Sequence, residues 1–267
     1  RLNQNSVSTI VDSGLNAPSK ISIFENRLYI LDSGNNQIKE FDGLQLQTLF
    51  NHPNFNSPQG LLIDNGLIYI SDTNNNSIKW TAEGVETLAD IGLSSPTGLA
   101  VNNFGMMLVA DTGNNAIKEI FRNETYPIIN EGLSSPTALV FDNNDLYIAD
   151  TGSSTIKKFD GQMLTTVVND GLNSPLDLAI DSNGHLYIAD TGNNAIKKFD
   201  GTKLITILDT GLSSPSGIFL DENDNLYIAD TGNNAIKKLE TSPPSLSGTP
   251  SINDVGEHNV SLVLSDG

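Results

Sequence analysis

The chain has 267 residues, no cysteine, and 32 acidic against 14 basic residues, which gives a formal net charge of −18. Without cysteine it has neither disulfides nor thiolate metal sites. So acidic a chain lacks the basic face that displaces counterions from phosphates, which predicts no nucleic acid among its partners. No apolar stretch approaches the roughly 20 residues that span a bilayer, so we predict that the protein is not embedded in a membrane.

The first predicted strand covers residues 6–12 and contains the sequence VSTIV. It precedes the turn sequence GLNAP. The strand resembles the last strand of the repeating unit described next, although it stands at the opposite end of the chain.

From this point a unit of about 40 residues recurs six times. Its most constant phrase is LYIAD followed by TGNNAIKK or a variant, and the aspartate recurs every 39 or 40 residues, at Asp32, Asp72, Asp111, Asp150, Asp190 and Asp230. A proline recurs every 38 to 40 residues, at Pro18, Pro58, Pro96, Pro136, Pro175 and Pro215. A period of this length is typical of propeller blades or of helical arrays.

The apolar runs within one unit distinguish these two architectures. In the sixth unit they are SGIFLD, NLYIAD and AIKKLE, which are short, rich in β-branched and aromatic residues, and separated by the turn sequences DEND and TGNN. No run has helical length or a 3.6-residue period, so each predicts a strand. LYIAD is apolar on both faces, as expected for a strand buried between two layers. The units are therefore predicted to be blades.

Every unit except the sixth adds a fourth run, such as LITILD at 204–209. After Glu240 the chain turns instead into TSPPSLSG. We therefore predict that the strand at residues 6–12 pairs onto the sixth blade, so that the ring closes without an unpaired inner edge. The fold class predicted is all-β, a six-bladed propeller over residues 1–240 with four-stranded blades.

The phrases DSNGHLYIADTGNNAIKKF and DENDNLYIADTGNNAIKKL resemble NHL repeats. The resemblance covers residues 6–240 and implies a six-bladed propeller. The family often has arginine after the asparagine pair, whereas this chain has Gln37, Ser77, Ala116, Thr155, Ala195 and Ala235 there. A function that depends on that arginine is therefore not expected.

The tail suggests further domains. Residues 241–248 have the composition of a linker, and residues 249–267 resemble the start of an immunoglobulin- or cadherin-like module of bacterial surface proteins. A complete module takes about 100 residues, so the chain is predicted to be part of a longer protein. We expect this protein to be exported and located outside the cell or at the cell surface of a bacterium. We expect the propeller to be monomeric within it.

Two repeated features have a structural and a functional interpretation. The six Asp-Thr pairs are compatible with a ring of metal-binding carboxylates, but tight turns need the same residues to satisfy their own N–H groups, and recurrence in every blade favours the turns. The turns at Asp142, Asp181 and Asp221 are rich in oxygen ligands but lack the glycine and distal glutamate of a calcium hand. We therefore predict no cofactor, with a structural calcium ion as the open alternative. The lysine pairs, such as Lys197-Lys198, are interpreted as solvated charges on outer strands.

Departures from the repeat are the better guide to a binding site. The loop HPNFN places His52, Asn54 and Phe55 on the face of the GLSSP-like loops. The second residue after each proline reads Lys20, Gly60, Gly98, Ala138, Asp177 and Gly217. We expect the four small residues to leave the channel mouth open, with Lys20, Asp177 and the apolar Leu176 forming a site for a small polar ligand or a peptide end. The alternative is that Phe55 packs under its own loop and that the two charges are only solvated.

The leading functional prediction is a non-catalytic binding or interaction module for a protein or glycan ligand, and therefore not an enzyme. The NHL resemblance keeps one alternative open, because this ring also carries an amidating lyase, in which histidines hold a metal, and streptogramin-type lyases. That alternative is a metal-dependent lyase or hydrolase at the channel mouth, with Lys20, His52 and Asp177 as its available side chains. His185, the other propeller histidine, is expected on the opposite face.

Overall fold

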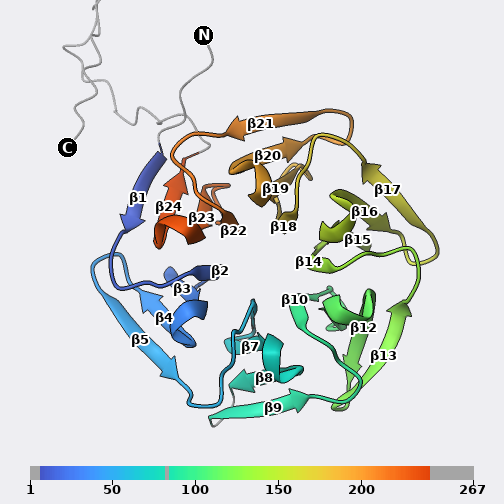
Figure 1. Ribbon diagram of the computed structural model, residues 1–267, viewed down its shortest axis with the longest axis horizontal. Coiled ribbons are helices and arrows are strands. Elements are labelled where there is room, and N and C mark those ends of the chain that lie inside the picture. Colours follow the sequence, from blue (N-terminus) through green and yellow to red (C-terminus); the bar gives the residue numbers. More distant parts are fainter. Residues whose placement is uncertain (1–6, 82–83, 241–267) are drawn as a thin grey trace, which may run out of the picture.

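The computed structural model describes residues 7–81 and 84–240, which form six four-stranded antiparallel sheets around a central axis (Figure 1). The predicted six-bladed propeller is confirmed. The predicted linker at 241–248 and the predicted module at 249–267 lie outside the described residues.

In blades 1 to 5 the strands run in sequence order from the axis outward, and in blade 6 the three inner strands do so. Blade 1 consists of β2 (Pro18–Phe24), β3 (Arg27–Asp32), β4 (Gln37–Phe41) and β5 (Leu46–Asn51). Blade 2 consists of β6 (Gly60–Asp64), β7 (Leu67–Asp72), β8 (Ser77–Thr81) and β9 (Val85–Ala89). Blade 3 consists of β10 (Pro96–Val101), β11 (Met107–Asp111), β12 (Ala116–Phe121) and β13 (Glu124–Ile129).

Blade 4 consists of β14 (Pro136–Asp142), β15 (Asp145–Asp150), β16 (Thr155–Phe159) and β17 (Leu164–Val168). Blade 5 consists of β18 (Pro175–Ile180), β19 (Leu186–Asp190), β20 (Ala195–Phe199) and β21 (Leu204–Leu208). Blade 6 consists of β22 (Pro215–Leu220), β23 (Leu226–Asp230) and β24 (Ala235–Leu239), and its outer strand is β1 (Val7–Val11) from the start of the chain.

The ring closes through β1, as predicted. This strand pairs antiparallel with β24, with Val7 opposite Leu239 and Thr9 opposite Lys237. Figure 1 shows β1 and β24, from opposite ends of the sequence, side by side. The first and last parts of the propeller therefore share one sheet, which leaves no inner strand edge unpaired at the junction.

A short 3₁₀ turn joins the second and third strands of every blade. These turns are η1 (Ser33–Asn35), η2 (Thr73–Asn75), η3 (Thr112–Asn114), η4 (Thr151–Ser153), η5 (Thr191–Asn193) and η6 (Thr231–Asn233). The residue after each turn has left-handed backbone angles, as for Asn36 at φ 53° and Asn234 at φ 53°. Asparagine tolerates this conformation better than other residues with a side chain, which accounts for the second asparagine of the repeat. Within the described residues no helix is long and apolar enough to cross a membrane.

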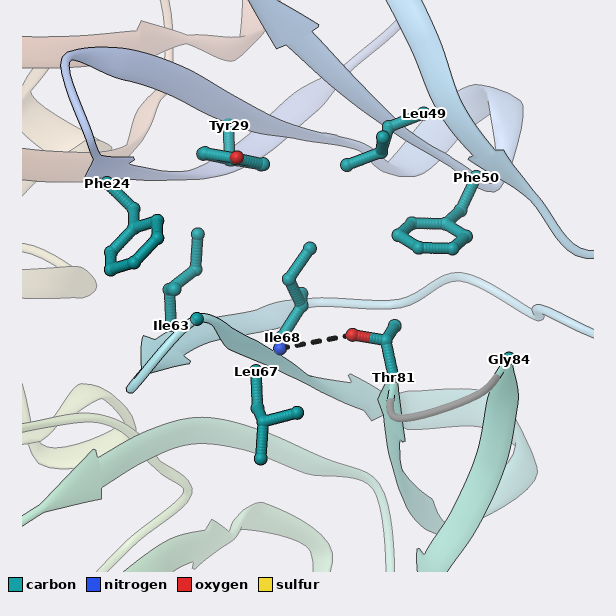
Figure 2. Close-up of a pocket in the computed structure, with 10 residues that line it drawn as sticks. Phe24, Tyr29, Leu49, Phe50, Ile63, Leu67, Ile68, Thr81 and Gly84 are labelled. Carbon is teal, nitrogen blue, oxygen red and sulfur yellow. Dashed lines mark hydrogen bonds between the residues drawn. The ribbon is translucent and has the colours of Figure 1, made fainter.

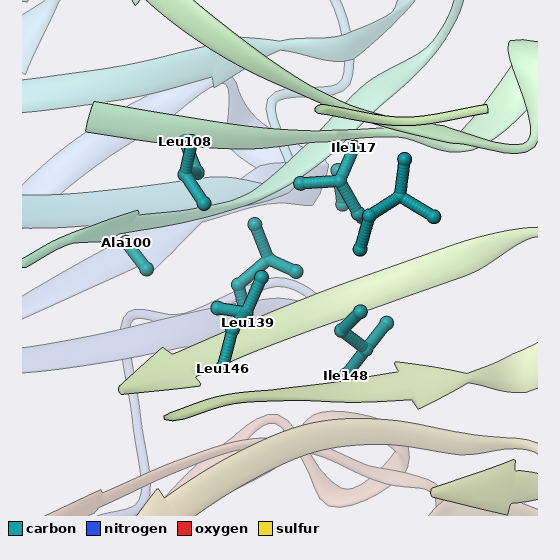
Figure 3. Close-up of a cluster of buried hydrophobic side chains, with 8 residues drawn as sticks. Ala100, Leu108, Ile117, Leu139, Leu146 and Ile148 are labelled. Carbon is teal, nitrogen blue, oxygen red and sulfur yellow. The ribbon is translucent and has the colours of Figure 1, made fainter. Parts of the chain in front are cut away.

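The hydrophobic core lies between adjacent blades rather than within one layer. Figure 3 shows one such cluster, in which Leu108 and Ile117 of blade 3 face Leu139 and Ile148 of blade 4. The second strands are buried on both faces, as β19 is over its whole length. This explains why LYIAD is apolar at successive positions instead of alternating with polar residues.

Candidate functional site

The aspartates of the repeat bind the loop that enters their own blade. Each is almost fully buried, and its Oδ1 accepts a hydrogen bond at 2.6–2.7 Å from a backbone N–H of the loop that enters its own blade. In five blades its Oδ2 accepts a hydrogen bond at 2.7–2.8 Å from the first asparagine of the NN pair, while Ser153 donates in blade 4. The aspartates therefore have a structural role, but it differs from the predicted one, because none of them accepts a backbone N–H of its own 3₁₀ turn.

The first lysine of each repeat supplies the charge that balances this aspartate. Lys197 lies 2.7 Å from Asp190 and Lys237 lies 2.7 Å from Asp230, with side chains only 13% exposed. The prediction that these lysines are solvated charges on outer strands is wrong, because they lie on the third strands and are paired with buried carboxylates. A buried carboxylate needs such a partner or several N–H donors, and here it has both.

Two further contacts join each blade to the next. The Thr or Ser after the aspartate donates its hydroxyl at 2.5–2.8 Å to the carbonyl of the next blade's proline, from Ser33 to Pro58 through Thr231 to Pro18. The left-handed residue after each 3₁₀ turn accepts the N–H of the residue before that proline. The distance is 2.7–2.8 Å for the five asparagines, including Asn234 with Ala17, and 3.2 Å for Ser154. We call the contacts made by Asp, Thr or Ser, and Asn the clasp.

The channel along the axis is a cavity of about 350 Å³ lined by the inner strands of all six blades. Its lining is mainly aliphatic, with residues such as Ile21, Leu99 and Leu139. Lys20 and Asp177 are the only charged residues among those that the structure describes along this cavity. Their side chains are 12% and 6% exposed, and Lys20 Nζ donates to Asp177 Oδ1.

The backbone fixes the Asp177 carboxylate. Its Oδ1 accepts the N–H of Leu178 at 2.9 Å and its Oδ2 accepts the N–H of Ile218 in blade 6 at 2.8 Å. Lys20 comes from blade 1 and reaches past blade 6, where Gly217 has no side chain at the same level. The ion pair therefore bridges three blades inside an apolar channel, and its ammonium group has a defined position.

Three of the four small residues at this level have a packing role. A Cβ on Gly60, Gly98 or Gly217 would collide with the carbonyl oxygen of the neighbouring blade, which belongs to Thr97, Thr137 or Ser19 respectively. The glycines are required because adjacent inner strands approach each other closely there.

The other predicted site residues lie elsewhere on the ring. Phe55 is 4% exposed and belongs to the core between blades 1 and 2, where it takes the place of the leucine of GLSSP-like loops. His52 packs against it, with ring centroids 5.3 Å apart. Asn54 is exposed, and its carbonyl accepts from the Asn75 side chain at 2.5 Å. The structure thus brings Lys20 and Asp177 together and groups His52 with Phe55.

Leu176 is half-buried beside Asp177, and its carbonyl accepts the hydroxyl of Thr137 at 3.2 Å. The aliphatic residues that surround the ion pair could not be recognised from the sequence, because their pattern is that of any buried strand. Within residues 7–81 and 84–240, no group of three or more His, Cys, Asp and Glu side chains is arranged to hold a metal ion.

A second cluster of ionisable groups lies in blade 5, at the Asp181 turn, whose sequence is rich in oxygen ligands. Asp181 Oδ2 lies 3.0 Å from His185 Nδ1 and 2.8 Å from Lys198 Nζ, and its Oδ1 accepts the N–H groups of Asn183 and His185. Burial by itself would raise the pKa of Asp181, but the hydrogen bonds from Lys198, His185 and Asn183 lower it to about 2. The carboxylate oxygens already have protein donors, as expected for a hairpin turn.

The NHL repeat model matches the chain at residues 55–80, 172–199 and 212–239, so the chain carries NHL repeats, as predicted. No curated protein matches it in sequence. Among solved structures it is similar to a catalytically inactive virginiamycin B lyase from Staphylococcus aureus with quinupristin, at TM-score 0.70 and 14% identity over 89% of this chain and 99% of that one.

It is also similar to a gluconolactonase from Xanthomonas campestris, at TM-score 0.76 and 16% identity over 90% of this chain and 91% of that one. A chain from a nidogen/laminin complex matches at TM-score 0.69 and 20% identity, over 77% of this chain and 86% of that one. At these identities the likeness concerns the fold alone.

The prediction that the chain is not an enzyme is contradicted by these neighbours, since two of the three propellers are enzymes. The prediction relied on repetitive blades and on the lack of clustered histidines. Repetitive blades do not argue against an enzyme, because a lyase and a gluconolactonase have the same architecture.

Proposed function

We propose that this chain is an enzyme of the hydrolase or lyase class that acts on a small molecule in the central channel. The observation that carries the proposal is the Lys20–Asp177 pair, the only charged groups among the described residues that line this aliphatic cavity of about 350 Å³. A cavity of this size is within the range of about 300–1,000 Å³ found for small-molecule sites. The lyase and the gluconolactonase support the proposal at the level of the fold.

We assign to Lys20 the role of contacting the substrate. Hydrolysis of a cyclic ester adds the hydroxyl group of water to the acyl carbon, breaks the acyl–oxygen bond of the ring and transfers the other proton of water to the released ring oxygen. Negative charge develops on the carbonyl oxygen between these events. An ammonium group held in an apolar site stabilises that charge more than it would in water. Asp177 is a positioning residue, because both of its oxygens already accept backbone N–H groups and it acts by orienting Lys20.

The metal-dependent form of this function is not part of the proposal. A protonated lysine is not a metal ligand, the Asp177 oxygens are bonded to N–H groups, and His52 packs on Phe55 in a separate loop. The described donor set therefore does not fit a metal at the channel, and no step is assigned to one.

The test is hydrolysis of D-glucono-1,5-lactone, followed by pH-stat, and ring opening of quinupristin, followed by mass spectrometry. We expect one of the two to proceed faster with the protein than in buffer. Lys20→Met should abolish that activity, Lys20→Arg should retain part of it, and Asp177→Asn should lower kcat more than it raises KM. Wild-type protein without activity on either compound, or Lys20→Met with the wild-type rate, would overturn the proposal.

Binding of a protein or glycan partner is a second candidate function, and the loop from His52 to Ser57 favours it. This loop departs from the GLSSP pattern and exposes Asn54 next to a half-buried His52. The nidogen/laminin complex supports protein binding at the level of the fold. We propose that such a partner would meet a monomeric propeller outside the cell. A glycan array probed with wild type and Asn54→Ala tests the glycan, and equal signals from both would argue against this loop.

A further inference from the structure

Near its end, the third strand of each blade has one residue whose side chain faces the preceding blade. In blade 2 this residue is of a different type from the residue in the other blades. In the other five blades it is a large apolar residue packed into the core between its own blade and the preceding one, namely Phe41, Ile120, Phe159, Phe199 and Leu239. In blade 2 the position holds Thr81, which follows Trp80 and accepts the N–H of Ile68 at 3.2 Å. A side chain of three heavy atoms stands where its equivalents carry four or seven.

A cavity of about 540 Å³ lies at this position, between blades 1 and 2. Figure 2 shows Tyr29, Leu49 and Phe50 on the blade 1 side and Ile68 and Thr81 on the blade 2 side. A well-packed interior tolerates few voids larger than a water molecule. The small Thr81 side chain lies on the wall of this gap. The volume of the gap is within the range of about 300–1,000 Å³ for ligand pockets.

The walls of the gap select for a neutral, apolar occupant. Three aromatic rings, those of Phe24, Tyr29 and Phe50, line it, and none of its described lining residues is charged. Partial burial, with the nearby Glu40 carboxylate, raises the pKa of the Tyr29 phenol, which therefore stays neutral. An anionic ligand would find no cation among the described residues that line the gap, and the nearby Arg27 is already paired with Glu40. A flat ring system would gain edge or face contacts with the aromatic walls.

We propose that the gap between blades 1 and 2, which Thr81 lines, is a binding site for a small, neutral, ring-bearing apolar molecule. This site is separate from the channel, because none of the residues that line the gap lines the channel. The proposal therefore does not depend on the proposed enzymatic function.

The test uses N-phenyl-1-naphthylamine, a neutral probe whose fluorescence rises in apolar surroundings, titrated into the full chain. We expect saturable binding to one site per wild-type chain. Thr81→Phe restores the side chain that other blades have and should weaken binding by roughly tenfold or more, because the ring occupies the ligand's place. Thr81→Ser keeps the hydroxyl and the space, so its affinity should stay within about twofold of wild type.

The reciprocal variant is Phe159→Thr, which removes the corresponding ring between blades 3 and 4 and should create a second site. If Thr81→Phe does not fold, as judged by its circular dichroism, Ile63→Trp narrows the same gap from β6 and replaces it in the test. Unsaturable binding to wild type, or equal affinity of wild type and the narrowed variant, would overturn the proposal.

Discussion

The clasp and the channel differ in how far their residues repeat from blade to blade. At the clasp the blades repeat the same residues, except for Ser33 in blade 1 and Ser154 in blade 4. Each clasp residue is bonded to the entry loop of its own or the next blade. In the channel the equivalent positions differ between blades, and the two departures, Lys20 and Asp177, form a charged pair in aliphatic surroundings. Repetition therefore marks the contacts that hold the blades together, and departures mark the places where a ligand site can form.

The largest effect is expected from removal of a clasp aspartate. Asp190→Ala leaves the N–H of Asn173 and the ammonium of Lys197 without their buried acceptor. Breaking a buried charged network by removing one partner costs about 3–5 kcal/mol. Urea denaturation measures the loss in free energy of unfolding. The control is Asp209→Ala, which removes an exposed aspartate of the same blade. A loss below about 1 kcal/mol would show that the clasp is not a main source of stability.

The next effect concerns ring closure. A chain without residues 1–12 loses the outer strand of blade 6, so we expect faster amide exchange in Leu226–Ala229, part of β23. The edge of β24 would then be unpaired, which lowers the free energy of local opening. Hydrogen exchange followed by mass spectrometry checks this, with Leu146–Ala149 in blade 4 as the internal reference. Unchanged protection in blade 6 would contradict closure through β1.

A smaller effect depends on pH. Because the pKa of Asp181 is lowered from its usual value of 3.8 to about 2, its contribution is complete above pH 3.8 and is lost as the pH falls through 2. Such a shift corresponds to about 2 kcal/mol. Asp181→Asn should therefore be less stable than wild type at pH 6 and approach it at pH 2. Urea unfolding at both values measures the difference, and a deficit independent of pH would contradict the ionic origin.

The smallest expected effect tests the one irregular clasp. Ser154 accepts the N–H of Ser174 at 3.2 Å, whereas the asparagines in other blades accept at 2.7–2.8 Å. Ser154→Asn also suits the left-handed backbone at φ 55° better. It should stabilise the protein by about 0.5–1 kcal/mol. Thermal unfolding checks this, and destabilisation would mean that the serine is required in blade 4.

Sequence patterns were sufficient for the blade count, the strands and the closing strand, because strand period and turn residues repeat six times. They were insufficient for contacts between blades. Pairing of Lys197 with Asp190 depends on the side-chain direction across two strands, and the role of Gly217 depends on how closely neighbouring strands approach. The Thr81 departure was visible in the sequence, but the gap depends on which residues of blade 1 lie opposite it.

One pair of variants tests directly whether activity depends on the channel and stability on the clasp. Activity on D-glucono-1,5-lactone or quinupristin, together with urea stability, should be determined for Lys20→Met and Asp190→Ala. We predict that Lys20→Met loses the activity but remains folded, and that Asp190→Ala loses stability but keeps the activity under conditions in which it is folded. The reverse pattern, or a wild-type protein without activity on either compound, would contradict the assignment of catalysis to the channel.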